Sequence, residues 1–321
     1  MKFTYKMNKT RSKILEELSQ NCRISTTQLA KKIQKPRHIV AYHKQKLVDT
    51  GTIRGSQLII NYEALGCTEY LVYLKLFQFS KIKKEVAEFL QAHPRVRWAA
   101  SVFPNFSLRV SLIAHSSADL DTFMDDFEDK FGKHIIDREI LTNKELIKSE
   151  AYTTKDIINE RALTKVKLQN VDKILLRVLC KNPKASLVSL AKEADVSIET
   201  ARQRIKKLHQ ARFIETFATK HEGTKVGHNF WCVLLFRLNN SRNNIEKLRT
   251  LVNSSLWFGK TRKSVGKWNF EMTVYGESYN DLLHTVDQLE NLFGDDFEGY
   301  QLQVYTNRII RTRIPEAVLR I

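Results

Sequence analysis

The chain has 321 residues, 42% of them hydrophobic and 27% charged, and a formal net charge of +18. This length exceeds what a single hydrophobic core usually supports, so more than one domain is expected. The sequence has no run of about 18 apolar residues to span a membrane, and its basic first ten residues lack the apolar segment of a signal peptide. We therefore expect a folded protein of the cytoplasm.

The cysteines lie apart, without a CxxC pair, at Cys22, Cys67, Cys180 and Cys232. This spacing predicts neither a zinc site nor a disulfide framework, so no metal or other cofactor is expected. We interpret the four side chains as small buried hydrophobes.

The positive charge is concentrated in two short segments. Residues 1–65 carry a net charge of +9 and residues 163–226 carry +8, whereas residues 66–162 carry −1 and residues 227–321 carry +2. A cationic excess of this kind favours a polyanionic partner such as nucleic acid. Membrane binding is not expected, because the charge falls on compact segments rather than on one amphipathic cationic helix.

The sequence repeats itself once. Lys13-Ile14-Leu15 is matched by Lys173-Ile174-Leu175 at an offset of 160, and Phe131-Gly132 is matched by Phe293-Gly294 at an offset of 162. Matches between these points keep the same order with single-residue slips, so the chain is interpreted as a tandem duplication.

Each copy begins with a helical hydrophobic spacing that predicts three helices. In the first copy, Ser25 is a candidate N-cap of the second helix, Pro36 suits the start of the third, and Gly51 suits its end. Residues 53–61 are predicted to form a short two-stranded wing that turns at Gly55-Ser56. In the second copy Ser197 is the N-cap of the third helix, and Arg212 replaces the terminating glycine. Three helices and a wing predict a winged helix-turn-helix domain.

Each copy then changes to a pattern of strands and helices in the order βαββαβ, which is the ferredoxin-like motif. The predicted fold class is therefore α+β, with two tandem copies of a winged helix-turn-helix domain followed by a ferredoxin-like βαββαβ (RAM-type) domain. The predicted boundaries are residues 1–65 and 170–226 for the winged helices, 66–148 and 227–321 for the βαββαβ domains, and 149–169 for a partly helical linker.

Several motifs carry a resemblance to a known family. Leu29-Ala30-Lys31-Lys32, Gly51-Thr52-Ile53 and Leu65-Gly66 resemble the Lrp/AsnC (feast/famine) regulators, and Leu190-Ala191-Lys192 with Val265-Gly266-Lys267-Trp268 continues the likeness in the second copy. The resemblance implies a transcriptional regulator that binds double-stranded DNA in the nucleoid. It also implies that the βαββαβ domains pair. In this chain the pair would be a pseudo-dimer, and such chains could assemble further into homo-oligomers.

In a helix-turn-helix protein the third helix enters the major groove, and the basic side chains around it contact phosphates. The helical phase places Ile39, Val40 and Leu47 in the core of the first copy, and Ala201, Ile205 and Leu208 in that of the second. The candidate DNA-binding residues are Lys35, Arg37, His38, Ala41, Tyr42, Lys44, Gln45 and Arg54 in the first copy, and Ile198, Glu199, Arg202, Gln203, Arg204, Lys206 and Lys207 in the second. The two sets share almost no residue types, so we expect an asymmetric site.

An effector site is expected only in outline. The resemblance implies amino-acid binding near a Gly-x-aromatic-Asp turn between the second and third strands of the βαββαβ domain. Pro104-Asn105-Phe106-Ser107 lacks both the glycine and the acid, and Gly266-Lys267-Trp268-Asn269 has asparagine in place of the acid. Without a carboxylate to pair with a ligand ammonium group, the sequence leaves the effector undefined.

Two other functions fit the same domain order. Siroheme decarboxylases resemble this layout and use histidine and arginine side chains, but the nine histidines here do not gather in the predicted strands. A chromosome-organising protein would use the same basic surfaces without reading bases. Because the chain also lacks the motifs of other catalytic classes, we expect a regulator rather than an enzyme.

Overall fold

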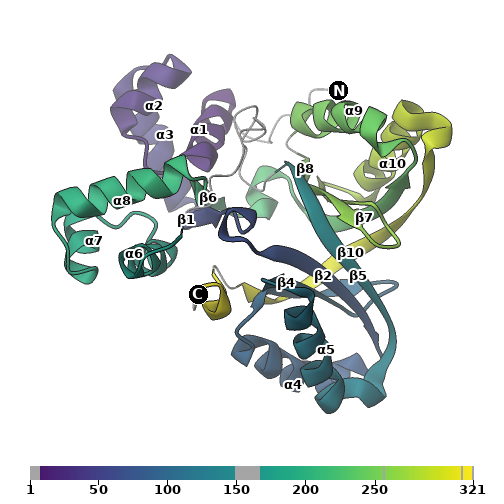
Figure 1. Ribbon diagram of the computed structural model, residues 1–321. Coiled ribbons are helices and arrows are strands. Elements are labelled where there is room, and N and C mark those ends of the chain that lie inside the picture. The colour runs from purple at the N-terminus through teal and green to yellow at the C-terminus, as the bar shows by residue number, and fades with distance from the viewer. Residues whose placement is uncertain (1–7, 149–166, 256, 312–313, 320–321) are drawn as a thin grey trace. The chain divides into compact units, whose positions relative to one another are not determined.

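A computed structural model describes residues 8–148, 167–255, 257–311 and 314–319 (Figure 1). The predicted linker at 149–169 lies almost entirely outside the described residues. The helices are α1 (Lys9–Gln20), α2 (Thr26–Ile33), α3 (Arg37–Asp49), α4 (Phe79–Ala92), α5 (Ser117–Phe131), α6 (Asn170–Lys181), α7 (Leu187–Glu193), α8 (Ile198–Gln210), α9 (Ser241–Ser254) and α10 (Tyr279–Phe293). The strands are β1 (Ile53–Ile60), β2 (Thr68–Leu76), β3 (Val96–Phe103), β4 (Leu108–Ala114), β5 (Ile135–Lys148), β6 (Ile214–His221), β7 (Phe230–Leu238), β8 (Phe258–Val265), β9 (Phe270–Gly276) and β10 (Phe297–Arg311).

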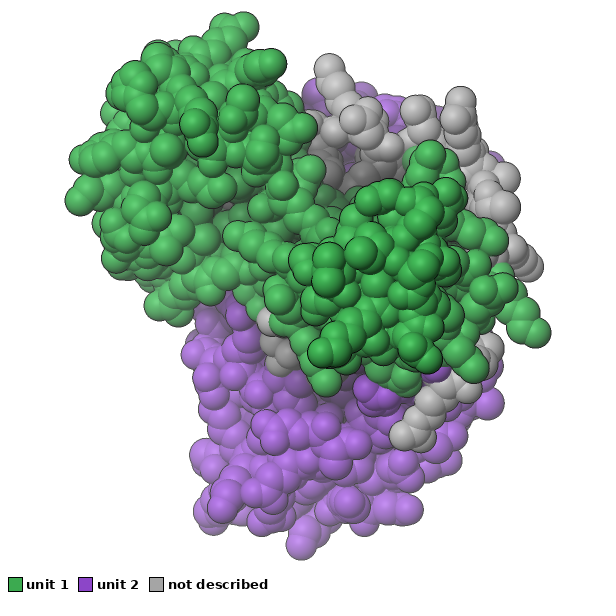
Figure 2. All heavy atoms as spheres, turned by 90° about the vertical axis from the view of Figure 1, so that its left-hand side faces the viewer, with its two compact units in different colours: residues 1–65, 150–229 green, residues 66–149, 230–321 purple. Residues whose placement is uncertain are grey.

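The chain divides into two compact units, and each unit takes a part from both copies of the repeat (Figure 2). Unit 1 holds residues 1–65 and 150–229, and unit 2 holds residues 66–149 and 230–321. The two winged helices therefore form one unit, and the two βαββαβ domains form the other. Like elements of the duplication associate with each other rather than with their neighbours in sequence.

Local signals set the helix ends of unit 1 much as predicted. The Ser25 hydroxyl accepts a hydrogen bond from the Gln28 backbone N–H at 3.2 Å, and the Gln28 side chain accepts one from the Ser25 N–H at 3.1 Å. Ser197 caps α8 through the Thr200 N–H at 3.0 Å. Gly51 follows α3 with a φ of +65°, the left-handed conformation that glycine adopts without strain. Arg212 takes the same conformation after α8, with a φ of +59° and a side chain that makes it less favourable.

The predicted two-stranded wing of the first copy is wrong. Residues Ile53–Ile60 form the single strand β1, which pairs antiparallel with β6 of the second copy instead of folding back at Gly55-Ser56. The physical reason is that a lone wing strand leaves its backbone groups unpaired, and the equivalent strand of the other copy satisfies them. Figure 1 shows this ribbon between the two groups of three helices.

Further contacts join the two winged helices of unit 1. The Arg23 guanidinium donates to the carbonyl oxygens of Pro183 at 2.6 Å and Ala185 at 3.1 Å, and it lies 4.1 Å from the centre of the Phe217 ring. The Cys22 backbone N–H donates to the Phe217 carbonyl at 2.6 Å. Helix α1 packs on β6, and helix α6 packs on β1. Each winged domain, or head, therefore packs against a strand from the other copy.

Unit 2 is a closed barrel of eight strands in the order β10-β3-β4-β2-β5-β8-β9-β7. Each copy supplies four consecutive strands, and the two sheets meet where β5 pairs with β8 and β10 pairs with β3. Helices α4 and α5 cover the sheet of the first copy, and α9 and α10 cover that of the second (Figure 1). The last strand of each copy thus closes the sheet of the other, and no barrel edge is left open among these strands.

The apolar positions predicted for the core are buried with one exception. Val40 and Leu47 of α3 are buried, as are Ala201, Ile205 and Leu208 of α8, whereas Ile39 is only half-buried. The four cysteines are free and buried, as expected for small hydrophobes.

Gly266 allows β8 to pass close to β5. A Cβ atom at this position would lie 2.6 Å from Leu141 Cδ2 and 2.8 Å from the Ile140 carbonyl oxygen, and the φ of +148° disfavours any side chain. Gly299 of the same unit has a φ of +151° but no atom within 4 Å of its added Cβ. The two glycines therefore have similar φ angles and differ in the space around them.

We predict that Gly266→Ala destabilises unit 2 by about 1–3 kcal/mol more than Gly299→Ala, because only the first substitution overpacks the β5–β8 contact. All tryptophans of the chain, Trp98, Trp231, Trp257 and Trp268, lie in unit 2, so tryptophan fluorescence during urea unfolding reports on this unit. Equal destabilisation by the two variants would show that the close approach to β5 carries no cost.

Candidate functional site

The third helices of the two winged domains present basic and polar side chains to solvent. Of the predicted DNA-binding residues, all but two have exposed side chains. The exposed residues are Lys35, Arg37, His38, Ala41, Tyr42, Gln45 and Arg54 from the first copy, and Ile198, Glu199, Arg202, Gln203, Lys206 and Lys207 from the second. Their exposure follows from the burial of the apolar residues on the opposite side of α3 and α8.

Arg204 is one of the two exceptions. Its Nε donates to Asp172 Oδ1 at 2.8 Å, and its second nitrogen donates to Asp172 Oδ2, so the pair is bidentate. Asp172 lies on α6 and is almost fully buried, and this hydrogen-bonded partner raises the pKa of Arg204. Arg204 therefore ties α8 to α6, which sets it apart from the exposed residues of the predicted set.

Lys44 is the second exception. It is half-buried, and burial together with the neighbouring charge of Lys184 lowers the pKa of its ammonium group. Lys184 precedes α7 of the second copy, so Lys44 faces the other winged helix of unit 1. Helical phase alone does not reveal this neighbour, because it comes from the other copy.

Several exposed side chains of α3 and α8 are paired with neighbours on the same helix. These two helices correspond to the recognition helices of helix-turn-helix proteins. Glu199 forms an ion pair with Arg202 and accepts a hydrogen bond from Gln203 at 3.0 Å, and Gln45 donates to Asp49 at 2.7 Å. Pairs on the surface contribute roughly 0.2–1 kcal/mol, so they are readily exchanged for other partners. These contacts hold the side chains of Arg202 and Gln203 close to the N-terminal turn of α8.

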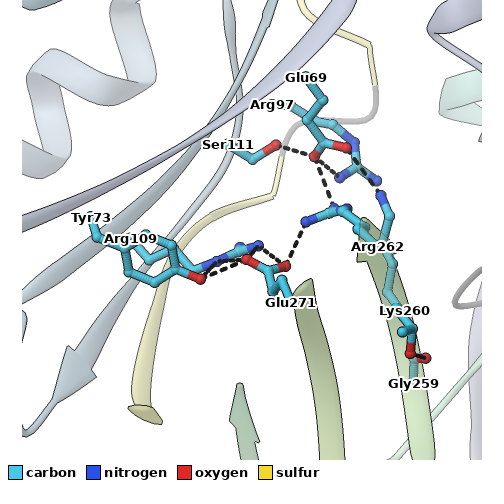
Figure 3. A network of polar contacts seen from close by, with 10 residues as sticks. Glu69, Tyr73, Arg97, Arg109, Ser111, Gly259, Lys260, Arg262 and Glu271 are labelled. Carbon is cyan, nitrogen blue, oxygen red and sulfur yellow. Dashed lines mark hydrogen bonds and ion pairs between the residues drawn. The ribbon is translucent and has the colours of Figure 1, made fainter. Parts of the chain in front are cut away.

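The barrel of unit 2 holds a second group of polar residues, which the sequence analysis missed (Figure 3). Arg109 of β4 donates to Glu271 of β9, with its Nη2 2.6 Å from Oε1 and 2.9 Å from Oε2. The Tyr73 hydroxyl donates to Glu271 Oε2 at 2.6 Å, and Arg262 Nη1 lies 2.6 Å from Oε1. All four side chains are buried, at 5% exposure or less.

Glu69 of β2 is the other carboxylate of this network. It pairs with Arg262 at 3.1 Å, with Lys260 at 3.2 Å and with Arg97 at 3.2 Å, and it accepts a hydrogen bond from Ser111 at 2.5 Å. Burial raises the pKa of Glu69, but the charges of Arg262, Lys260 and Arg97 outweigh it and hold the pKa well below its usual range. Glu271 has a lowered pKa for the same reason, with Arg109 and Arg262 outweighing burial.

A sequence signal for this network was present. Arg109 is the one charged residue of the buried strand Leu108–Ala114, and Glu271 is the one charged residue of Phe270–Gly276, at an offset of 162, the spacing of the repeat. Opposite charges at equivalent positions of buried strands predict a pair between the copies. Recognising it requires the knowledge that the two copies face each other.

The turns predicted to border an effector site contribute to the interior of the barrel. Phe106 is buried and its ring centre lies 5.4 Å from that of Tyr73, while Trp268 packs against the same apolar cluster. The Asn269 amide donates to the Leu238 carbonyl at 2.8 Å, and its oxygen accepts from the Leu238 N–H at 2.9 Å. An aspartate could not make both bonds, so asparagine at this position has a role within the fold.

The described part of the chain holds no cluster of three or more histidine, cysteine, aspartate or glutamate side chains placed to bind a metal ion. Its helices include none that is both long and apolar enough to cross a membrane. None of the eight described barrel strands contains a histidine.

Comparison with known proteins identifies the winged domains directly. The family described as winged helix-turn-helix DNA-binding matches residues 7–54 and again residues 168–215. No curated protein matches the sequence. The two segments are therefore winged helix-turn-helix modules of a DNA-binding class, and they coincide with the two regions of high positive charge.

Among solved structures, the siroheme decarboxylase NirDL is similar along almost the whole chain, with 15% identity, a TM-score of 0.64, and coverage of 95% of this chain and 94% of that chain. AsnC of E. coli aligns with 46% of this chain and 98% of its own length, at 23% identity and a TM-score of 0.40. A transcriptional regulator of Neisseria meningitidis, solved with L-methionine, covers 46% of this chain and 94% of its own, at 18% identity and a TM-score of 0.41.

At this identity the likeness to NirDL shows a shared fold, and the chemistry must be argued from the residues. The predicted architecture, two winged helix-turn-helix domains with two ferredoxin-like domains in a tandem-duplicated chain, is confirmed.

We predict that Glu69→Gln lowers the stability of unit 2 by about 3 kcal/mol near neutral pH, because it leaves Arg262 with fewer buried partners. Glu69 has a lower pKa in the folded state than its ordinary 4.5, so its stabilisation is present above pH 4.5 and is lost as the pH falls through the folded value. Melting curves followed by tryptophan fluorescence from about pH 7 to about pH 3 should therefore decline less steeply for the variant. Parallel declines in the two proteins would contradict the assignment.

Proposed function

We propose that the chain is a DNA-binding transcriptional regulator of the Lrp/AsnC type, which acts in the cytoplasm on the nucleoid. The observation that carries the proposal is the coincidence of charge and fold. Residues 1–65 and 163–226, which contain the two segments of the winged helix-turn-helix class, carry +17 of the +18 net charge, and their third helices expose arginine, lysine and glutamine side chains. Phosphates attract such a surface whatever the base sequence.

Base reading is assigned to the outward faces of α3 and α8. Arg37 and Arg202 can each donate two hydrogen bonds to a guanine, and Gln45 and Gln203 can pair with adenine. Lys35, Lys46, Lys206 and Lys207 suit the phosphate backbone. The two outward faces differ residue by residue, so the proposed site consists of two unlike half-sites.

The likeness to NirDL favours a second candidate function, siroheme decarboxylation, because the similarity covers 95% of this chain and so includes both units. Two observations weigh against it. The described barrel strands contain no histidine, and the buried arginines are engaged by Glu69 and Glu271 rather than free for the carboxylates of a tetrapyrrole. The regulator therefore remains the better-supported function.

The first test is the selection of bound duplexes from a random pool at near-physiological salt. We expect wild-type protein to enrich an asymmetric motif, and Arg37→Ala with Arg202→Ala to abolish the enrichment, because a bidentate contact discriminates between bases by about 1–3 kcal/mol. Lys133→Ala with Arg242→Ala is the matched control, since it removes the same charge from exposed positions of unit 2.

Three outcomes would contradict this proposal in different ways. Enrichment of a perfect palindrome would overturn the assignment of unlike half-sites. Binding without any enriched motif would indicate a chromosome-organising protein that reads no bases. Absence of binding would exclude the regulator and make decarboxylation the activity to assay.

A further prediction concerns the spacing of the two half-sites. Because β1 pairs with β6 and Arg23 joins the two heads, unit 1 presents its recognition helices at a fixed separation. Insertion of about five base pairs between the half-sites turns one of them to the opposite face of the duplex. We expect this insertion to weaken binding to the level of a single half-site, and an insertion of about ten base pairs not to restore it. Gel-shift titrations measure both, and unchanged affinity for either spacer would show that the heads move independently.

A further inference from the structure

The central contact of the buried network joins equivalent positions of the two copies. Arg109 lies opposite Tyr73 in the β4–β2 register, and Glu271 lies opposite Leu235 in the β9–β7 register. Both members of the second pair are 162 residues beyond those of the first. Residues at equivalent positions can contact each other only near the pseudo-twofold axis that relates the two copies. Arg109 and Glu271 therefore lie at this axis.

The chemistry at this contact is opposite in the two copies. The first copy contributes the Arg109 guanidinium and the second contributes the Glu271 carboxylate, joined by hydrogen bonds of 2.6 and 2.9 Å with both side chains at most 5% exposed. The aromatic rings of Trp98, Tyr73 and Tyr305 lie 5.0, 5.6 and 6.0 Å from the same guanidinium. The site is shaped and charged for a guanidinium group, and the first copy supplies one.

The surrounding charges differ between the copies as well. Arg262 of the second copy corresponds to Ala100 of the first. Arg262 lies opposite Glu271 in the β8–β9 register, and Ala100 lies opposite Arg109 in the β3–β4 register. Arg262 joins both carboxylates, Glu271 at 2.6 Å and Glu69 at 3.1 Å. The inner faces of the two sheets are therefore complementary in charge without being copies of one another.

We propose that this network makes the two βαββαβ domains selective for each other, so that the inner face of the first accepts the second and rejects another copy of itself. Two first copies would bring Arg109 against Arg109, without the Glu271 carboxylate that pairs with it in this chain. Like charges held together inside an interface strongly disfavour it. A partner domain that fits the first copy must carry an acid at the position of Glu271. This selectivity is independent of what the winged helices bind.

Single substitutions in the full chain place like charges at the Arg109–Glu271 contact. Arg109→Glu sets a second carboxylate against Glu271, and Arg109→Met is its matched neutral control. Glu271→Arg sets a second guanidinium against Arg109, and Glu271→Gln is its control. We expect each like-charge variant to melt at least about 10 °C below its neutral control, as followed by the tryptophan fluorescence of unit 2. Equal melting temperatures within both pairs would overturn the proposal, because the network would then contribute packing alone.

A second measurement applies if the neutral variants are themselves too unstable to purify. Arg109→Gly removes the guanidinium and leaves its site lined by Glu271 and the aromatic rings. The variant is refolded with methylguanidinium chloride, or with methylammonium chloride at the same concentration. Recovery of native tryptophan fluorescence with methylguanidinium but not with methylammonium supports a site built for the side chain of the first copy. Equal recovery with both salts, or with neither, overturns the proposal.

Discussion

Backbone pairing between the two copies is the constraint on which both units depend. A βαββαβ sheet has two open edges, and in unit 2 the last strand of each copy closes an edge of the other through β5–β8 and β10–β3. The same solution recurs in unit 1, where β1 and β6 pair although they are more than 150 residues apart. The duplication therefore gives each copy the partner strand that it lacks. This explains why the chain is organised as two mixed units rather than as two independent halves.

Closure of the barrel places ionised side chains where water is scarce. Removing Arg109, Arg262, Glu69 and Glu271 from water is costly, and their mutual attraction offsets that cost only because each carboxylate has several donors. An apolar interior would serve stability as well or better. A network of this kind instead favours one arrangement of the two sheets over others, which fits the unlike residues that the copies contribute.

The two units differ in net charge and in where their charged side chains lie. Unit 1 carries the excess of lysine and arginine on winged helices, with arginine and glutamine side chains exposed on the recognition helices. Unit 2 is close to neutral and keeps its charged cluster inside, paired and hydrogen-bonded. One chain thus combines a fold that it shares with a decarboxylase and two winged helices of a DNA-binding class, and the proposed function rests on the residues of unit 1.

The sequence by itself determined the elements, because their signals are local. The helical spacing, the Ser25 and Ser197 caps and Gly51 placed α2, α3 and α8 to within a few residues. The exposed faces of α3 and α8 followed from the same periodicity. The repeat and the segregated charge, which are also readable from residues alone, indicated the duplicated architecture and its nucleic-acid partner.

Only the tertiary structure decided how the copies meet. Nothing near Ile53–Ile60 in sequence reveals that its partner is β6, so a hairpin was predicted where an exchange between copies exists. Arg204 has the helical phase of a surface residue, but it forms a hydrogen-bonded ion pair with the buried Asp172 of another helix. Arg109 and Glu271 become a pair only when strands from opposite halves face each other. These interactions connect residues far apart in the chain, and such contacts depend on the packing of whole elements rather than on any local pattern.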